Sequence, residues 1–76
     1  MADKICVMVE TAKDGYKTAM FYVHGPLWEI GVKGCPCGSG MNLTDEDVVQ
    51  DLLNRTNMES KTTFKLENIN IIKRDR

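Results

Sequence analysis

The dipeptide Asp14-Gly15 constrains the fold of this chain more than any other feature, because stretches of alternating apolar and polar residues flank it on both sides. The alternation predicts one strand from Lys4 to Lys13 and a second from Tyr16 to His24. Asp-Gly is typical of two-residue β-hairpin loops, since a type I′ turn needs positive φ at both central positions. The sequence therefore predicts an antiparallel hairpin at the start of the chain.

A two-residue loop would pair Lys13 with Tyr16 and Val9 with Met20, and this register decides which side chains share a face. One face would carry Ile5, Val7, Val9, Met20, Tyr22 and His24, and the other would carry Cys6, Met8, Ala19, Phe21 and Val23. Both faces are apolar, whereas one helix of about three turns covers only one of them. We expect the second face to be covered by self-association, for example in a homodimer, by a partner, or by the chain's own loop and C-terminal segment.

Two further segments precede the predicted helix. Pro26 ends the second strand, because proline has no N–H to donate to a sheet. The stretch from Leu27 to Lys33 alternates again, which predicts a third strand with one face formed by Trp28, Ile30 and Val32. Gly34 to Asn42 is a loop by composition.

The helix signal begins at Thr44, a good N-cap residue with Asp47 three positions later, in an arrangement that resembles a capping box. Leu43 and Val48 occupy the two positions of a hydrophobic staple. The helix should end near residues 55–57. Its apolar stripe, expected to pack on the first hairpin, consists of Val48, Val49, Leu52 and Leu53.

The stretch from Thr62 to Lys73 is rich in β-forming residues, and its alternation changes phase at Asn68. The change predicts a bulge or a tight turn between two short strands. Residues 1–76 are therefore expected to form a single α+β domain. Its predicted architecture is an antiparallel sheet of four or five strands with one helix packed on one face, in the order β-β-β-α-β(-β).

Composition narrows the class of protein. An apolar fraction of 42% with 28% charged residues is typical of a globular domain. A net charge of −1 gives no general attraction to nucleic acid or anionic membranes, and no apolar run approaches the roughly 20 residues of a membrane span. The N-terminal stretch does not resemble a signal peptide. An odd number of cysteines favours a reducing compartment, so we expect a cytoplasmic protein.

Cys35 and Cys37, one residue apart in a turn-forming stretch, have the side chains for a metal site. Zinc takes four ligands, typically thiolate or imidazole, and the chain offers four such residues: Cys6, His24, Cys35 and Cys37. The predicted register opposes this set, because Cys6 and His24 would project from opposite faces unless a bulge separates them. Zinc is therefore an alternative, and the main expectation is a chain without a cofactor.

The six residues Cys35-Pro36-Cys37-Gly38-Ser39-Gly40 resemble the opening of the SEC-C motif, a zinc-binding module found at the end of a protein-translocation ATPase and in many other proteins. In that family a basic stretch and a Cys-Cys or Cys-His pair follow, so the resemblance implies half of a zinc site. Met41 to Gln50 contains neither cysteine nor histidine. The rest of the chain resembles no family.

A thiol redox protein is a further alternative, since a Cys-x-Cys pair can form a strained disulfide that exchanges readily. Such activity needs a cation or a helix N-terminus next to the thiol, and the nearest predicted helix start is acidic. Other catalytic sets do not assemble, because His24 is the sole histidine and no third group is placed to orient it. We therefore predict a protein that is not an enzyme.

Nucleic acid is an alternative partner, with a zinc ion at Cys35 and Cys37 stabilising the module. Aromatic strand residues would stack on bases. The near-neutral net charge makes the electrostatic part of such binding small. The basic residues that would contact phosphates are Lys61, Lys65, Lys73, Arg74 and Arg76.

The leading hypothesis is a small non-catalytic interaction protein, an inhibitor, adaptor or accessory subunit, that binds a protein partner through a sheet face or edge. It rests on the lack of a catalytic set in the sequence and on more apolar hairpin surface than one helix can cover. The expected contact residues are Met20, Tyr22 and Trp28, with the acidic helix start as an electrostatic rim.

Overall fold

The structure, a computed structural model, describes residues 5–75 of the chain. Within these residues the predicted α+β class, the single helix and the order β-β-β-α-β are confirmed, and the sheet has four strands. The elements are β1 Ile5–Thr11, β2 Lys17–Phe21, the 3-10 helix η1 Leu27–Ile30, β3 Cys37–Gly40, α1 Asp45–Ser60, the 3-10 helix η2 Leu66–Asn68 and β4 Ile69–Asp75.

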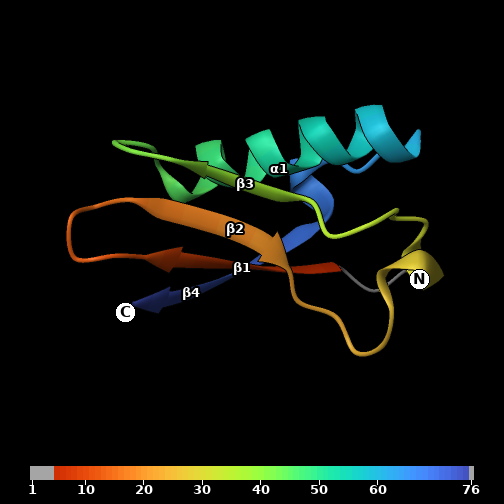
Figure 1. The fold of residues 1–76 in the computed structure, drawn as a ribbon, viewed down its shortest axis with the longest axis horizontal. Coiled ribbons are helices and arrows are strands. Elements are labelled where there is room, and N and C mark those ends of the chain that lie inside the picture. The colour runs from red at the N-terminus through yellow and green to blue at the C-terminus, as the bar shows by residue number, and fades with distance from the viewer. Residues whose placement is uncertain (1–4, 76) are drawn as a thin grey trace.

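The strands form one mixed sheet in the order β3-β2-β1-β4. The predicted antiparallel hairpin of β1 and β2 is confirmed, and β2 also runs antiparallel to β3, but β4 runs parallel to β1, so the sheet is mixed and not wholly antiparallel as predicted. The helix explains the parallel pair, because it carries the chain from β3 at one edge of the sheet to β4 at the other edge (Figure 1). A long crossover of this kind is the connection that parallel strands need.

The register of the β1–β2 hairpin differs by one residue from the prediction, since Val9 pairs with Ala19 and not with the residue after it. The loop is longer than two residues: the Ala12 N–H donates to the Tyr16 carbonyl (2.9 Å), and the Gly15 N–H donates to the Ala12 carbonyl (3.0 Å). Within this turn only Gly15 has positive φ, at 90°. This is the pattern of a three-residue loop that ends in a glycine bulge.

The one-residue shift reverses the two faces of β2. Ala19 and Phe21 lie on the face that α1 covers, beside Val9. Met20 and Tyr22 belong to the opposite face, although a two-residue loop would have placed them beside Val9. The predicted composition of the two hairpin faces is therefore wrong.

The predicted third strand, Leu27–Lys33, is also wrong. Leu27–Ile30 forms η1 instead. Trp28 is exposed while Val32 is buried, so residues predicted to share a face do not share one. The strand that pairs with β2 is Cys37–Gly40, which lies inside the stretch predicted as a loop.

Close packing against α1 and against Leu43 explains why β3 forms at two glycines. Gly38 is buried against the helix, and a Cβ at this position would lie 2.6 Å from the Val48 carbonyl oxygen and 2.8 Å from the Leu52 nitrogen. A Cβ on Gly40 would lie 2.5 Å from Cδ1 of Leu43. Glycine lets the strand pass this close to the helix. A tertiary contact thus overrides the low strand propensity of Gly-Ser-Gly.

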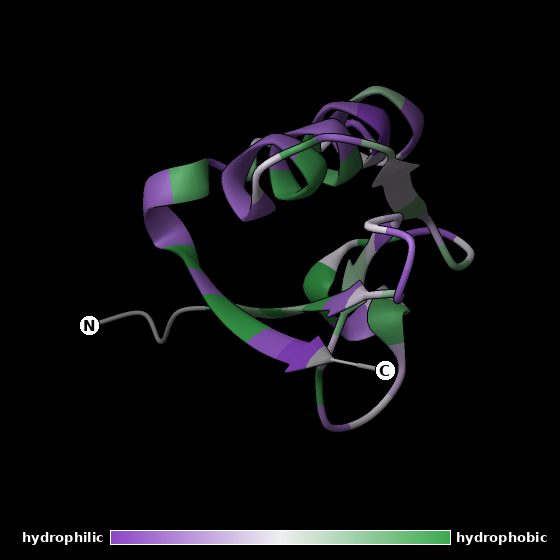
Figure 2. Ribbon diagram, turned by 90° about the vertical axis from the view of Figure 1, so that its left-hand side faces the viewer, coloured by the Kyte–Doolittle hydropathy of each residue, from purple (hydrophilic) through white to green (hydrophobic). Residues whose placement is uncertain are grey.

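The hydrophobic core lies between α1 and one face of the sheet. Figure 2, a view turned by 90° from Figure 1, shows the helix as a layer on one side of the strands. The four helix residues in the core are the predicted stripe, which is confirmed. The buried cluster consists of Val7, Val9, Ala19, Val48, Val49, Leu52, Leu53 and Ile69.

The helix begins where predicted and ends later. Thr44 Oγ1 accepts a hydrogen bond from the Asp47 N–H at 3.1 Å, which confirms the N-cap. The helix continues to Ser60, and Lys61 ends it in the left-handed conformation with φ of 54°. Neither this helix nor any other in residues 5–75 has the length and apolar character to cross a membrane.

Asn57 explains why residues 62–65 do not form the first of the two predicted C-terminal strands. Its Oδ1 accepts from the Phe64 N–H (2.9 Å), and its Nδ2 donates to the Phe64 carbonyl (3.0 Å). These bonds satisfy the backbone groups that a neighbouring strand would otherwise pair. The predicted change of phase at Asn68 coincides with η2, a tight turn after which β4 begins.

Candidate functional site

The sheet face opposite α1 carries a row of apolar side chains, one from each strand. Met20 on β2 pairs with Cys37 on β3 and with Met8 on β1, and Met8 pairs with Ile72 on β4. Strand residues alternate between the two faces, and the sequence neighbours of these four face the helix. Since directly opposite residues have Cβ atoms about 4.5–5.5 Å apart, the four side chains are neighbours.

Tyr22 and Cys6 extend the row at one side. The Tyr22 N–H donates to the Cys6 carbonyl (2.9 Å), which continues the β1–β2 pairing past the end of β2. Met20 is 46% exposed and Tyr22 is 53% exposed, so the centre of this surface is open to solvent. We call six residues the outer sheet face: Cys6, Met8, Met20, Tyr22, Cys37 and Ile72.

A polar row borders the outer sheet face on its other side. Thr18 pairs with Ser39 and with Glu10, and Glu10 pairs with Arg74. The sheet surface therefore combines an apolar row with an adjacent row of hydroxyl groups and charges of both signs. This combination of an apolar centre and a polar border is typical of protein-binding surfaces.

The structure brings together two of the three predicted contact residues. Met20 and Tyr22 share the outer sheet face, whereas Trp28 lies apart in η1 and is 73% exposed. Sequence reasoning missed Cys37 and Ile72 as members of this surface. Cys37 belongs to it because β3 pairs with β2, and Ile72 belongs to it because β4 pairs with β1, so no local pattern in the sequence signals either one.

The four predicted zinc ligands are dispersed. Cys6 lies on β1, and Cys37 lies on β3 with β2 between them, while His24 follows β2 and Cys35 precedes β3. All three cysteines are free thiols, and Cys35 and Cys37 are exposed. Among residues 5–75, no three His, Cys, Asp or Glu side chains are grouped so that they could hold a metal ion.

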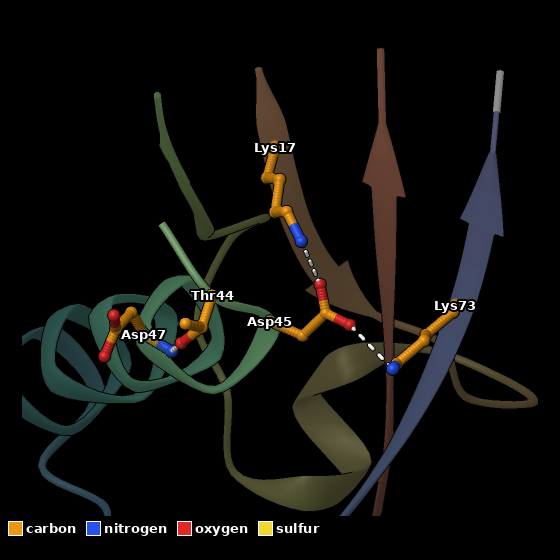
Figure 3. A network of polar contacts seen from close by, with 5 residues as sticks. All are labelled: Lys17, Thr44, Asp45, Asp47 and Lys73. Atoms are coloured by element: carbon orange, nitrogen blue, oxygen red, sulfur yellow. Dashed lines mark hydrogen bonds and ion pairs between the residues drawn. The ribbon is translucent and has the colours of Figure 1, made fainter. Parts of the chain in front are cut away.

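On the helix side of the sheet, Asp45 links the start of α1 to two strands (Figure 3). Its Oδ1 accepts a hydrogen bond from Lys17 Nζ at 2.5 Å, and its Oδ2 lies 3.2 Å from Lys73 Nζ. The Asp45 side chain is only 12% exposed. The hydrogen bond from Lys17 lowers the pKa of Asp45 below its usual value, burial opposes this shift, and Lys73 adds to the lowering. Asp45 therefore connects α1 to β2 and β4. Of the acidic helix start that was predicted as an electrostatic rim, Glu46 and Asp47 are the residues that are exposed.

The predicted nucleic-acid contacts are spread over several elements. Lys61 is the C-cap of α1, and Lys65 precedes η2. Lys73 pairs with Asp45 on the helix side, whereas the next strand residue, Arg74, belongs to the opposite face. Lys73 and Arg74 therefore lie on opposite faces of the sheet and cannot contact the same nucleic-acid strand from one surface. The fifth predicted contact, Arg76, lies outside the described residues.

Comparison with known proteins identifies no relative: no protein-family model, no curated protein and no solved structure matches the chain. The assignment of a function therefore rests on the chemistry of the surfaces described above.

Proposed function

We propose that this chain is a small non-catalytic interaction module, an inhibitor, adaptor or accessory subunit, that binds a protein partner through the outer sheet face. The observation that carries the proposal is the exposure of Met20 within an apolar row and of Tyr22 beside that row, on the side of the sheet opposite α1. Exposed apolar patches on small domains mark interaction sites.

The composition of this surface favours protein over nucleic acid as the partner. Methionine and tyrosine are enriched at protein interfaces, and the flexible thioether of methionine adapts to differently shaped partners. The polar row contributes Glu10 and Arg74, so its charges have both signs. Such a border suits the rim of a protein interface, whereas a nucleic-acid site needs a predominantly basic surface.

Trp28 is a second anchor in this proposal. Its side chain is 73% exposed on the segment that follows β2, and tryptophan, like tyrosine, is enriched among the residues that contribute most to binding energy. A partner that covers the outer sheet face and extends past Tyr22 to η1 would contact both Tyr22 and Trp28.

The proposal also includes a location. Free thiols persist in reducing compartments, and all three cysteines of the chain are free. A cytoplasmic module fits this redox state.

Photocrosslinking in cells that express the chain tests the proposal. Benzoylphenylalanine replaces Tyr22 in one variant and Met58, which is 81% exposed on α1, in a matched control. Illumination should link position 22 to one discrete protein and should give no such adduct from position 58. Mass spectrometry of the linked peptides then distinguishes a second copy of this chain from a different protein.

A pair of charge substitutions makes the test specific. Met20→Lys should abolish the adduct from position 22, because it buries an unpaired charge in the interface, while Met58→Lys should leave that adduct unchanged. Far-UV circular dichroism checks that both variants are folded. The proposal is wrong if position 22 gives no adduct, or if its adduct is as strong with Met20→Lys as without it.

A further inference from the structure

The segment Cys35-Pro36-Cys37 lies at the edge of the sheet, next to Met20. Cys37 is the first residue of β3 and pairs directly with Met20 on β2. Exposure alternates along the segment: Cys35 and Cys37 are exposed, Pro36 is half-buried and Gly38 is buried. The alternation continues the two-residue repeat of the strand back to Cys35. Both thiols therefore lie on the side of the outer sheet face.

Proline restricts the backbone between the two thiols. Cys35 precedes Pro36, and a residue in that position is biased toward extended conformations. In an extended backbone the Cα atoms of residues two apart are separated by about 6.6 Å, with both side chains on the same side. Met20 adds a thioether with three rotatable bonds directly opposite Cys37. Three sulfur-bearing side chains therefore come from neighbouring positions on the chain and the sheet, and all three are exposed.

We propose that Cys35, Cys37 and Met20 form a binding site for a soft monovalent metal ion, and that copper(I) is the ion that fits it. Thiolate and thioether sulfur are the ligands that select copper(I) in proteins. Two thiolates from Cys35 and Cys37 would bind the ion, and the Met20 sulfur would complete a low-coordinate, all-sulfur shell. This site does not depend on the protein-binding role proposed above.

The same geometry disfavours zinc. A closed zinc site takes four ligands, usually thiolate, imidazole or carboxylate, and the described part of the chain groups no three His, Cys, Asp or Glu side chains. Copper(I) is satisfied by fewer ligands and accepts the thioether that zinc does not favour. The pair of thiols beside a methionine therefore matches one class of ion and not the other.

The exposure of the site indicates an exchangeable ion and not a structural one. Cys35 and Cys37 are open to solvent, and the hydrophobic core is built from β-strand and α1 residues without them. Binding would displace the protons of both thiols, so the affinity should rise with pH. Removal of the metal should leave the fold intact, in contrast to small domains that fold around zinc.

A competition titration tests the site. The full chain, reduced and free of oxygen, is titrated with copper(I) in the presence of the chromophoric chelator bicinchoninate. We expect one copper(I) per chain, and X-ray absorption of the complex should show sulfur as the only ligand type. Cys35→Ser and Cys37→Ser should each weaken binding about a hundredfold or more, and Met20→Leu about tenfold, since loss of a ligand costs at least as much as loss of a supporting contact.

Matched controls come from the same residue types elsewhere. Cys6 is a half-buried thiol on β1 whose sulfur accepts a hydrogen bond from Asn70 Nδ2 at 3.7 Å, and Met58 is an exposed methionine on α1. Cys6→Ser and Met58→Leu should leave the copper(I) affinity unchanged. Circular dichroism of every variant, with and without metal, should show the same fold.

Four results would overturn the proposal. The wild-type chain could fail to hold copper(I) against the chelator. Cys6→Ser could weaken binding as much as Cys37→Ser does. The chain could instead bind one zinc ion that is lost when either Cys6 or His24 is substituted, which would favour the four-ligand zinc site. Equal affinities for Met20→Leu and Met58→Leu would remove Met20 from the site and overturn the three-sulfur assignment.

Discussion

Gly38 of β3 and Leu52 of α1 approach so closely that a Cβ on Gly38 would lie 2.8 Å from the Leu52 backbone nitrogen. The same Cβ would lie 2.6 Å from the Val48 carbonyl oxygen, so the strand and the helix would have to move apart. We expect Gly38→Ala to lower the free energy of unfolding by about 1–3 kcal/mol, measured by urea denaturation.

Gly40 supplies the matched control for this prediction. A Cβ there meets the end of the Leu43 side chain and not backbone atoms, and a side chain moves more easily than a helix. Gly40→Ala should therefore cost less than Gly38→Ala. Equal costs, or a neutral Gly38→Ala, would contradict the close contact between β3 and α1.

The hairpin loop makes a second prediction. Gly15 has φ of 90° and no atom within 4 Å of where a Cβ would lie, so a substitution there tests backbone conformation alone. Gly15→Ala should cost about 1–2 kcal/mol. Gly15→Asn should cost less, because asparagine enters the left-handed region more readily. Thermal unfolding of the two variants gives the comparison, and an unchanged midpoint for Gly15→Ala would show that this φ is not positive in solution.

Asp45 makes stability depend on pH. Its hydrogen bond to Lys17 and its contact with Lys73 hold the pKa of its carboxyl below the usual value, so the folded state binds the proton less tightly than the unfolded state does. The stabilisation is complete above about pH 4, near the pKa of the unfolded chain, and is lost as the pH falls through the lower folded pKa. Asp45→Asn should cost about 1–3 kcal/mol at neutral pH and should flatten the acid limb of the stability curve.

Glu46 is the control for the ion pair, because it lies in the same first turn of α1 but is exposed. Glu46→Gln loses only its interaction with the helix dipole, about 0.5 kcal/mol. Denaturant titrations at neutral pH and at about pH 3 separate the two variants. A similar loss in both would mean that the contacts with the two lysines contribute little.

The two faces of the hairpin should respond differently to truncation. Phe21 packs against the core, and its ring centroid lies 5.6 Å from that of Phe64. Phe21→Ala should therefore cost about 2–4 kcal/mol. Tyr22 is exposed on the opposite face, and Tyr22→Ala should cost less than about 1 kcal/mol. Urea denaturation of both variants measures the two losses of unfolding free energy. A larger loss for Tyr22→Ala than for Phe21→Ala would contradict the assignment of the two faces.

The helix and the existence of the hairpin could be predicted because their signals are local. Thr44 caps the helix through a bond to a residue three positions away, and the apolar stripe needs only the helical period. The register of the hairpin could not be predicted from local signals. Asp14-Gly15 satisfies a two-residue loop and also a three-residue loop with glycine last, and the choice between them moves Met20 from one face of the sheet to the other.

The position of the third strand depended on contacts between distant parts of the chain. The alternation of residues 27–33 fits a strand, while Gly38 and Gly40 have a low strand propensity. Glycine fits at Gly38 because α1 approaches the strand there, and at Gly40 because the Leu43 side chain lies close by. For the same reason the neighbourhood of Cys37 and Met20, on which the candidate metal site rests, could not be derived from the Cys-x-Cys spacing.

The central claim is that Met8, Met20 and Cys37 share the sheet face opposite the helix, and nuclear Overhauser contacts of Ala19 test it most directly. In the observed register Ala19 and Val9 form a non-hydrogen-bonded pair, whose α-carbons are about 4.5 Å apart. The account predicts a strong contact between the Hα atoms of Ala19 and Val9. A strong contact between the Hα atoms of Ala19 and Glu10 would restore the two-residue loop, turn Met20 toward the helix, and contradict both the proposed protein-binding surface and the proposed metal site.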